Sequence, residues 1–478
     1  MSELPKGWVG STIGEACLIE NGLRKPISLK ERAGCQGDFP YYGATGVIDY
    51  LNSYTHEGEY VLIGEDGANL LSKSKPLAFI ANGRYWVNNH AHTLRCLADS
   101  PNLYLEKYFN SLSLESWVTG SAQPKLTKKN LESIPYPLAP LAEQKRIVEK
   151  LDEVLAQVDT IKARLDGIPA LLKRFRQSVL ASAVSGKLTE EWRKDNESGC
   201  PQQEVESIIE SRKTLVTKRM QVPQEHLKNE EYPIPEDWKW VSLDSLSSKI
   251  VDGVHHKPEY VDEGVPFMSV KDIKGGKIYF DNCKYVSLET HDEIHPRCNP
   301  EKGDLLVTKS GTIGRTAIIK TDEIFDLFVS VALIKPASKK VNMEFINIAL
   351  MHWVNSIDVS SRVVGTAIKN LHLRDMRVLA VPFAPLTEQK EIVRLVDQYF
   401  AFADTVEAQV KKAQARVDNL TQSILAKAFR GELVAQDPND EPADKLLERI
   451  SAARKEAEAL AKTAKKAEAA KKRAAKSV

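Results

Sequence analysis

The stretch PLAPLAEQKRIV, which begins at Pro137, returns about 245 residues later as PFAPLTEQKEIV, which begins at Pro382. The same spacing then holds without a gap for about fifty residues, so that QSVLA at Gln177 becomes QSILA at Gln422. Chance does not keep one spacing over such a length. The chain is therefore predicted to contain one structural unit twice.

Both repeated blocks have the hydrophobic spacing of long helices. Apolar residues recur at steps of three and four, which is the pattern of a coiled-coil seam. A second amphipathic helix is expected after each seam, near Phe175 and Leu420, and Gly186 and Gly431 stand where its C-terminus is expected. Such a seam usually packs inside its own domain, but two matched seams in one chain favour pairing with each other. The predicted seam residues are Ile147, Leu151, Val154, Val158, Ile161, Leu165, Ile392, Val396, Tyr399, Ala403, Val406 and Val410.

Upstream of each block the two halves diverge almost completely and read as mixed α/β domains. Near their starts, LPKGW at Leu4 resembles IPEDW at Ile234. Short β-rich runs such as Tyr60–Ile63 and Leu305–Val307 then alternate with glycine-rich turn clusters. The expected fold class is mixed α/β (α+β), with two globular domains joined by long helices that form a coiled coil, and an internal two-fold pseudo-repeat.

Shifts in composition mark the expected segment boundaries. Residues 195–231 are polar and charged and are expected to be a linker with a helical middle, and the chain from Ala443 onward is expected to be an exposed helix that ends in a basic tail. The expected segments are 1–140 (first globular domain), 141–194 (first helical block), 195–231 (linker), 232–385 (second globular domain), 386–434 (second helical block) and 435–478 (Ala/Lys/Glu-rich tail).

The overall composition is that of a folded protein with almost no net charge. Lys and Arg number 66 against 65 Asp and Glu, which leaves a net charge of +1. A nucleic-acid binder with this balance must concentrate its basic residues locally. The six cysteines form no CxxC pair, and no apolar run approaches the roughly 18 residues of a membrane span. We therefore expect a reduced, cytoplasmic protein that does not associate with membranes.

Motifs for catalysis are missing from the sequence. There is no GxxxxGK[ST] phosphate loop, no FxGxG cofactor loop, no [DN]PP[YF] tetrapeptide and no convincing Ser/His/Asp or Cys/His spacing. We therefore expect a non-catalytic chain.

Cys283, His291, His295 and Cys298 are the best candidate metal ligands, because the two histidines are one helical turn apart. Asp292 stands where the metalloprotease pattern requires Glu, and the proline after His295 disfavours a helix through that residue. Ordinary core or surface histidines are the simpler interpretation, so no metal site is expected.

Small polar loops can supply both the phosphate contacts and the base-edge contacts that DNA recognition requires. Such loops recur in both halves, at Gly64–Asn69 and Gly120–Asn130 and again at Lys309–Arg315 and Gly365–Arg374. Loop tips are also polar simply because they face water, and Glu65 and Asp66 would repel phosphate unless they meet a base-edge donor. The predicted DNA-binding residues are Gln123, Lys125, Lys128, Lys129, Lys309, Ser310, Thr312, Arg315, Lys369 and Asn370.

The repeated blocks, the QS[VI]LA segments and the paired GSAQ and GTAI loops at Gly120 and Gly365 resemble the specificity subunits of type I restriction–modification systems. The resemblance covers nearly the whole chain except its last forty or so residues. It implies two target recognition domains separated by an antiparallel pair of helices. It further implies that the partners are double-stranded DNA, two modification (methyltransferase) subunits and restriction (endonuclease and translocase) subunits.

The same resemblance implies that S-adenosylmethionine, ATP and Mg²⁺ belong to the partner subunits and that this chain binds no cofactor. The divergent domains would read a bipartite, asymmetric site. The first seam spans roughly 35 Å, close to one DNA turn, which predicts about five to seven unread base pairs between the half-sites. The alternatives are that the linker sets this spacing, that the chain is a coiled-coil scaffold for protein partners, or that it is a self-contained nuclease or methyltransferase.

Overall fold

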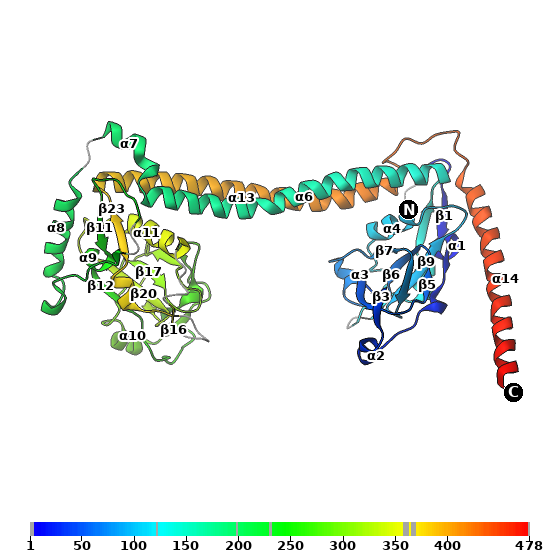
Figure 1. The fold of residues 1–478 in the computed structure, drawn as a ribbon, viewed down its shortest axis with the longest axis horizontal. Coiled ribbons are helices and arrows are strands. Elements are labelled where there is room, and N and C mark those ends of the chain that lie inside the picture. Colours follow the sequence, from blue (N-terminus) through cyan, green and yellow to red (C-terminus); the bar gives the residue numbers. More distant parts are fainter. Residues whose placement is uncertain are drawn as a thin grey trace. The chain divides into compact units, whose positions relative to one another are not determined.

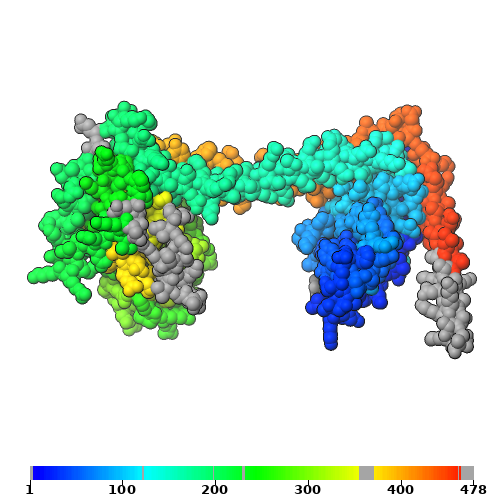
Figure 2. Space-filling model, viewed as in Figure 1, coloured from blue at the N-terminus to red at the C-terminus, as the bar shows by residue number. Residues whose placement is uncertain are grey.

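The computed structural model describes residues 4–120, 123–196, 199–228, 232–356, 363–364 and 370–476. The chain divides into two compact units, one made of Met1–Asp166 with Lys411–Val478 and the other of Gly167–Val410. Each unit contains one globular domain and parts of two long helices (Figure 1). In Figure 2 the first domain is the blue body and the second is green and yellow. No helix in the described part of the chain is long and apolar enough to cross a membrane.

The globular domain of the first unit contains two four-stranded sheets and a short antiparallel strand pair that closes the domain. In this pair β1 (Val9–Thr12) lies beside β10 (Pro135–Leu138). Helix α4 (Asn102–Ser111) packs on the central sheet through buried aromatic and leucine side chains. The central sheet has the order β2 (Cys17–Ile19), β9 (Ala91–Cys96), β6 (Tyr60–Gly64) and β7 (Ala78–Ala81), and the outer sheet the order β4 (Gly46–Leu51), β3 (Gln36–Gly43), β8 (Arg84–Val87) and β5 (His56–Glu57).

The second unit repeats the closing pair, the central sheet and three strands of the outer sheet, in the same order and with the same strand directions. Strand β11 (Lys239–Ser242) pairs with β23 (Ala380–Phe383), as β1 does with β10. Helix α11 (Met343–Ser356) contacts this pair and the central sheet. The central order is β12 (Ser247–Asp252), β20 (Val331–Pro336), β17 (Leu305–Thr308) and β18 (Thr316–Ile318), and a three-stranded sheet has the order β16 (Lys284–Val286), β13 (Val265–Met268) and β19 (Asp326–Leu327). The predicted pair of mixed α/β domains is thus confirmed.

The repeated blocks form two uninterrupted helices, α6 (Leu141–Val184) and α13 (Leu386–Ala428). The expectation of two helices in each block is therefore wrong, since the seam and the second amphipathic stretch belong to one helix. Gly186 and Gly431 follow the helix ends with φ of 73° and 71°. This left-handed conformation, which favours glycine, ends both helices where the sequence predicted.

The two helices run antiparallel within each unit. In the first unit, Lys162 Nζ donates to Asp418 Oδ1 at 2.8 Å. Four residues further along α6, Asp166 Oδ1 accepts from Gln414 Nε2 at 2.6 Å. Residue numbers therefore rise along α6 as they fall along α13.

The seam residues are mostly buried, but their partners differ from the prediction. Ile161 and Tyr399 remain 45% and 38% exposed, although the Tyr399 ring makes an edge contact with Phe175. Because the helices are antiparallel, the first seam shares a core with Ile424 and Leu425, which lie in the other block's second amphipathic stretch, and not with the second seam. The buried seam residues are Ile147, Leu151, Val158, Ile392, Val396, Ala403 and Val410, and Val154, Leu165 and Val406 are partly buried.

A buried hydrogen bond between tryptophan and glutamate fastens each globular domain to a long helix. Trp8 Nε1 donates to Glu143 Oε2 at 2.9 Å, and Trp238 Nε1 donates to Glu388 Oε2 at 2.9 Å. All four side chains are buried. Hydrogen bonds to charged groups contribute about 1.5–3 kcal/mol. This contact explains why a tryptophan near the start of each domain, Trp8 or Trp238, recurs together with the Glu-Gln pair near the start of each long helix.

The segments outside the repeat pack more closely than the sequence suggested. The predicted linker contains α8 (Pro201–Lys213), whose Ile208 is buried in the core of the second unit. The tail forms α14 (Ala443–Lys476), whose Leu446 and Ile450 are buried in the core of the first unit. Helix α8 agrees with the helical middle that was expected of the linker, whereas the expectation of an exposed tail helix is corrected for its first turns, which are buried.

Candidate nucleic-acid interface

In each domain, the two polar loops predicted to meet DNA lie side by side. In the first domain the Leu126 N–H donates to the Glu65 carbonyl at 2.8 Å, and in the second the Leu371 N–H donates to the Lys309 carbonyl at 2.8 Å. Glu65 directly follows the buried strand β6, and Lys309 directly follows its counterpart β17. Glu65 and Lys309 therefore occupy equivalent positions in the two domains.

This equivalent position carries opposite charges in the two domains. Glu65 accepts a hydrogen bond from Arg24 Nη1 at 2.6 Å, and Lys125 Nζ lies 3.2 Å from its other oxygen. Burial alone would raise the pKa of Glu65, but the hydrogen bond from Arg24 and the nearby positive charges hold that pKa below its usual value. Asp66, the next residue, accepts from His90 Nδ1 at 2.8 Å. The acidic pair that the sequence flagged as repelling phosphate is thus matched by basic neighbours.

In the second domain the polarity of the pair is reversed. Lys309 Nζ lies 3.0 Å from Asp252 Oδ2, and both side chains are almost fully buried. Arg297 and His255 each approach Asp252 Oδ1 at 3.1 Å, and both are more than half exposed. Burial tends to raise the pKa of Asp252, but the hydrogen bond from Lys309 and the other basic groups lower it overall. One carboxylate therefore gathers three basic groups at this loop.

The predicted contact residues of the first domain are accessible. Gln123 is exposed beside the loop, and the side chain of Lys125 is 51% exposed despite its ion pair with Glu65. Lys128 and Lys129 begin the short helix α5 (Lys128–Glu132), and both are exposed. These four side chains are free to reach a nucleic acid, so their assignment stays a prediction.

Among the described residues, the predicted DNA-binding residues of the second domain are less accessible than those of the first. The prediction that Lys309 binds DNA is corrected, because its ammonium group is buried and paired with Asp252 and is therefore not free to hold a phosphate. Thr312 is exposed, Ser310 is partly buried, and partly buried Arg315 donates to a backbone carbonyl. Of the others, Lys369 lies outside the described residues, and Asn370 begins β22 (Asn370–Leu371), with its side chain outside them.

Four basic residues beside these loops were missed by the sequence analysis: Arg24, His90, His255 and Arg297. Arg24 lies about forty positions from Glu65 in sequence, so no local spacing connects them. The recurrence of the polar loops marked the acidic partners Glu65 and Asp66 of the first domain, but no signal marked Asp252, which ends β12 outside these loops.

Comparisons with known proteins agree with this architecture. A family model described as the type I restriction modification DNA specificity domain matches residues 5–170 and 235–414. The specificity subunit of the type I restriction enzyme EcoBI from Escherichia coli is 39% identical over 344 residues, which are 69% of this chain and 66% of that protein. The specificity subunit of EcoDI, also from Escherichia coli, is 30% identical over 475 residues, which are 95% of this chain and 96% of that protein.

Solved structures share the fold at lower identity. One chain, from a study of complex assembly and conformational transition of the type I R-M system, has a TM-score of 0.62 at 17% identity, covering 90% of this chain and all of that one. The HsdS subunit from Thermoanaerobacter tengcongensis has a TM-score of 0.50 at 18% identity, covering 90% of this chain and 98% of that one. Since the family model matches both domains and their helices, this chain belongs to the family of type I restriction–modification DNA specificity subunits.

Proposed function

We propose that each globular domain reads one half of a bipartite, asymmetric DNA site for a type I restriction–modification complex. The observation that carries this proposal is that the equivalent loops expose different side chains, Lys125 and His90 in the first domain and His255 and Arg297 in the second. Two domains with one core but differently charged loops present different donors and acceptors to base edges. Two different half-sites make an asymmetric target.

The chain's role in the complex is to place DNA in register for other subunits. Methyl transfer to adenine and DNA cleavage belong to two modification subunits and to restriction subunits, and the long helices α6 and α13 offer the repeated surfaces on which two copies of one partner can dock. S-adenosylmethionine, ATP and Mg²⁺ are bound and used by those partner subunits. The purified chain alone is expected to transfer no methyl group, cut no DNA and hydrolyse no ATP.

Selection from a random duplex library tests this proposal. The chain, purified with candidate modification subunits, is used to retain DNA, and the retained molecules are sequenced. Two short, different motifs separated by a fixed unread gap are expected. Retention of a palindromic motif would contradict the asymmetric reading.

The same experiment addresses the scaffold alternative, which the family membership does not favour. A scaffold would hold the modification subunits and enrich no DNA sequence. A matched control uses modification subunits alone, so that any motif they select by themselves is subtracted.

A further inference from the structure

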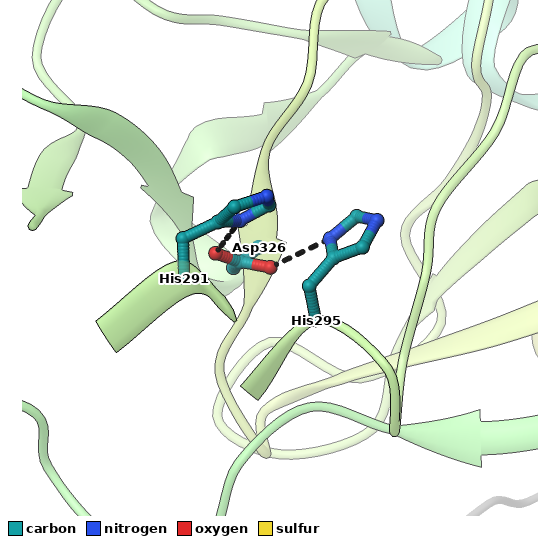
Figure 3. Close-up of side chains that lie close together, drawn as sticks. All are labelled: His291, His295 and Asp326. Carbon is teal, nitrogen blue, oxygen red and sulfur yellow. Dashed lines mark hydrogen bonds and ion pairs between the residues drawn. The ribbon is translucent and has the colours of Figure 1, made fainter. Parts of the chain in front are cut away.

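Two histidines and one aspartate of the second domain converge at one point, outside the polar loops described above. His291 lies in helix α10 (Leu288–Ile294), His295 directly follows that helix, and Asp326 begins strand β19. His291 Nδ1 lies 2.8 Å from Asp326 Oδ2, and His295 Nδ1 lies 3.0 Å from Asp326 Oδ1 (Figure 3). A four-residue step along a helix places both imidazoles on one side, facing the strand.

The charge of Asp326 is not balanced by a permanent cation. Its side chain is only 2% exposed, and its ion-pair partners among the described residues are the two imidazoles. A buried carboxylate without a compensating positive charge is costly. Three other buried aspartates of this unit pair with Lys or Arg, namely Asp244 with Arg212, Asp252 with Lys309 and Asp304 with Lys335, whereas buried Asp272 accepts hydrogen bonds from Ser269.

The two imidazole rings lie close together, 4.4 Å apart between centroids, and both Nδ1 atoms are directed at the one carboxylate. A divalent cation supplies the missing positive charge while both rings stay neutral, which is the form in which histidine binds metals.

We propose that His291, His295 and Asp326 bind a divalent transition-metal ion of the Zn²⁺ type. One ligand atom from each residue lies within 4.8 Å of the other two, and the donor set of two imidazoles and one carboxylate suits Zn²⁺. Ligands held at about 2.0–2.1 Å from a tetrahedral ion are about 3.3 Å apart, so small ring movements suffice. With the ring proton on Nε2, each neutral imidazole offers the lone pair of Nδ1 to the ion.

The side chain of His295 is 28% exposed, so solvent reaches this cluster. A water molecule would supply the fourth ligand. The cysteines of the sequence-based candidate set, Cys283 and Cys298, are not part of this group of ligand atoms and are buried in the hydrophobic core with Met268 and Leu306. The bound ion would tie α10 to β19 and so stabilise the outer sheet of the second domain.

Metal binding to the full-length chain tests the proposal. Chelator-treated protein is titrated with Zn²⁺, and bound metal and the thermal unfolding midpoint are measured for the parent and for Asp326→Asn and His295→Gln. Loss of a ligand should weaken this Zn²⁺ equivalent at least about tenfold and remove the rise of the midpoint with Zn²⁺. The variant His256→Gln, which removes an exposed histidine of the same domain, should behave like the parent.

The six free thiols can bind Zn²⁺ by themselves, so the difference between variants decides the result. Equal Zn²⁺ binding by the parent and by His295→Gln would overturn the proposal. His295→Cys provides a check that does not depend on loss, because a thiolate is also a Zn²⁺ and Co²⁺ ligand. It should retain the metal and show a Co²⁺–thiolate absorption band that His256→Cys lacks, and absence of that band in both would contradict the site.

Discussion

Lys309 and Asp252 form a buried ion pair at the loop that follows β17. Replacing Lys309 by Met leaves the Asp252 carboxylate buried with only its two more exposed partners. Removing one member of a buried pair costs about 3–5 kcal/mol, and Arg297 and His255 should keep the loss near the lower end. Denaturant unfolding of Lys309→Met should show this loss, whereas Lys302→Met, which breaks the exposed pair with Asp322, should cost less than about 1 kcal/mol. Equal, small losses for both would show that the pair is not structural.

The exposed lysines of the first domain are expected to contact phosphates. Neutralising Lys125, Lys128 or Lys129 to Gln should weaken binding to all sequences alike and reduce the salt dependence of binding by about one ion each. Gln123→Ala should instead change the preferred bases, if its amide reaches a base edge. Affinity measured over a range of salt concentrations checks this, with Lys302→Gln as the matched control. Unchanged slopes in all three lysine variants would mean that another face binds DNA.

His56 makes the first domain sensitive to acid. Its side chain is buried and stacks on the Tyr85 ring, and burial, with a smaller effect of the Arg24 charge, lowers its pKa to about 4. The unfolded imidazole takes up a proton below about pH 6.5. Stability is therefore full above that pH and is lost as the pH falls toward 4, by about 2 kcal/mol at pH 5. His56→Gln cannot titrate, so its unfolding free energy should fall less than the parent's between pH 7 and pH 5, and a matching fall would refute this origin.

At the scale of single residues, the positions of the polar loops could be predicted from the sequence, but the ion pairs around them could not. The recurrence of polar stretches correctly placed two loops side by side in each domain. The roles of Arg24 and Asp252 could not be predicted, because each pairs with a residue more than forty positions away through the folded sheet. For the same reason Lys309 looked like a free basic side chain, although it is buried.

At the scale of elements, the two tryptophan–glutamate contacts are alike in geometry but not in charge balance. Glu388 also binds Arg193 and Thr189, whereas the second oxygen of Glu143 has no hydrogen-bond partner among the described residues. Burial raises the pKa of Glu143 despite its bond from Trp8. Glu143→Gln should therefore change the unfolding free energy by less than about 1 kcal/mol, because an amide oxygen still accepts from the indole.

Glu388→Gln should cost about 2–3 kcal/mol more than its counterpart, because it leaves the mostly buried Arg193 without its carboxylate. Denaturant unfolding of the two single variants measures the difference directly. The same cost at both positions would indicate that Arg193 finds another partner.

The long helices were predictable in extent from hydrophobic spacing and in their ends from glycine. Their continuity was not, because a change in amphipathic pattern looks the same at a break and at a change of packing partner. Here the amphipathic pattern of α6 changes near Phe175, whose ring contacts Tyr399 and Phe402 of α13. The likeness of the two outer sheets was also beyond prediction, because their strands share an order but no recognisable sequence.

At the scale of the whole molecule, α6 and α13 each begin in one unit and end in the other. Lengthening both helices together should therefore change the unread gap in the DNA target. One heptad inserted after Asp166, with a matching heptad before Gln414, preserves the facing register and adds about 10 Å, or about three base pairs.

Selected DNA motifs report the gap for the parent and for the lengthened chain. A heptad in α6 alone is the control, since it breaks the antiparallel register and should impair binding. An unchanged gap in a lengthened chain that still supports methylation would assign the spacing to the stretch around α8 instead.

The tryptophan–glutamate contact also bears on how such chains acquire new targets. Both domains use the same two residue types at their entry and on their helix, and both close with the same strand pair. A domain that keeps these terminal contacts is an interchangeable cassette, whatever its loops recognise. Recombination between the repeated blocks can thus exchange whole domains while the contacts that attach them to the helices stay the same. A chain that carries the first domain twice should prefer an inverted repeat of one half-site.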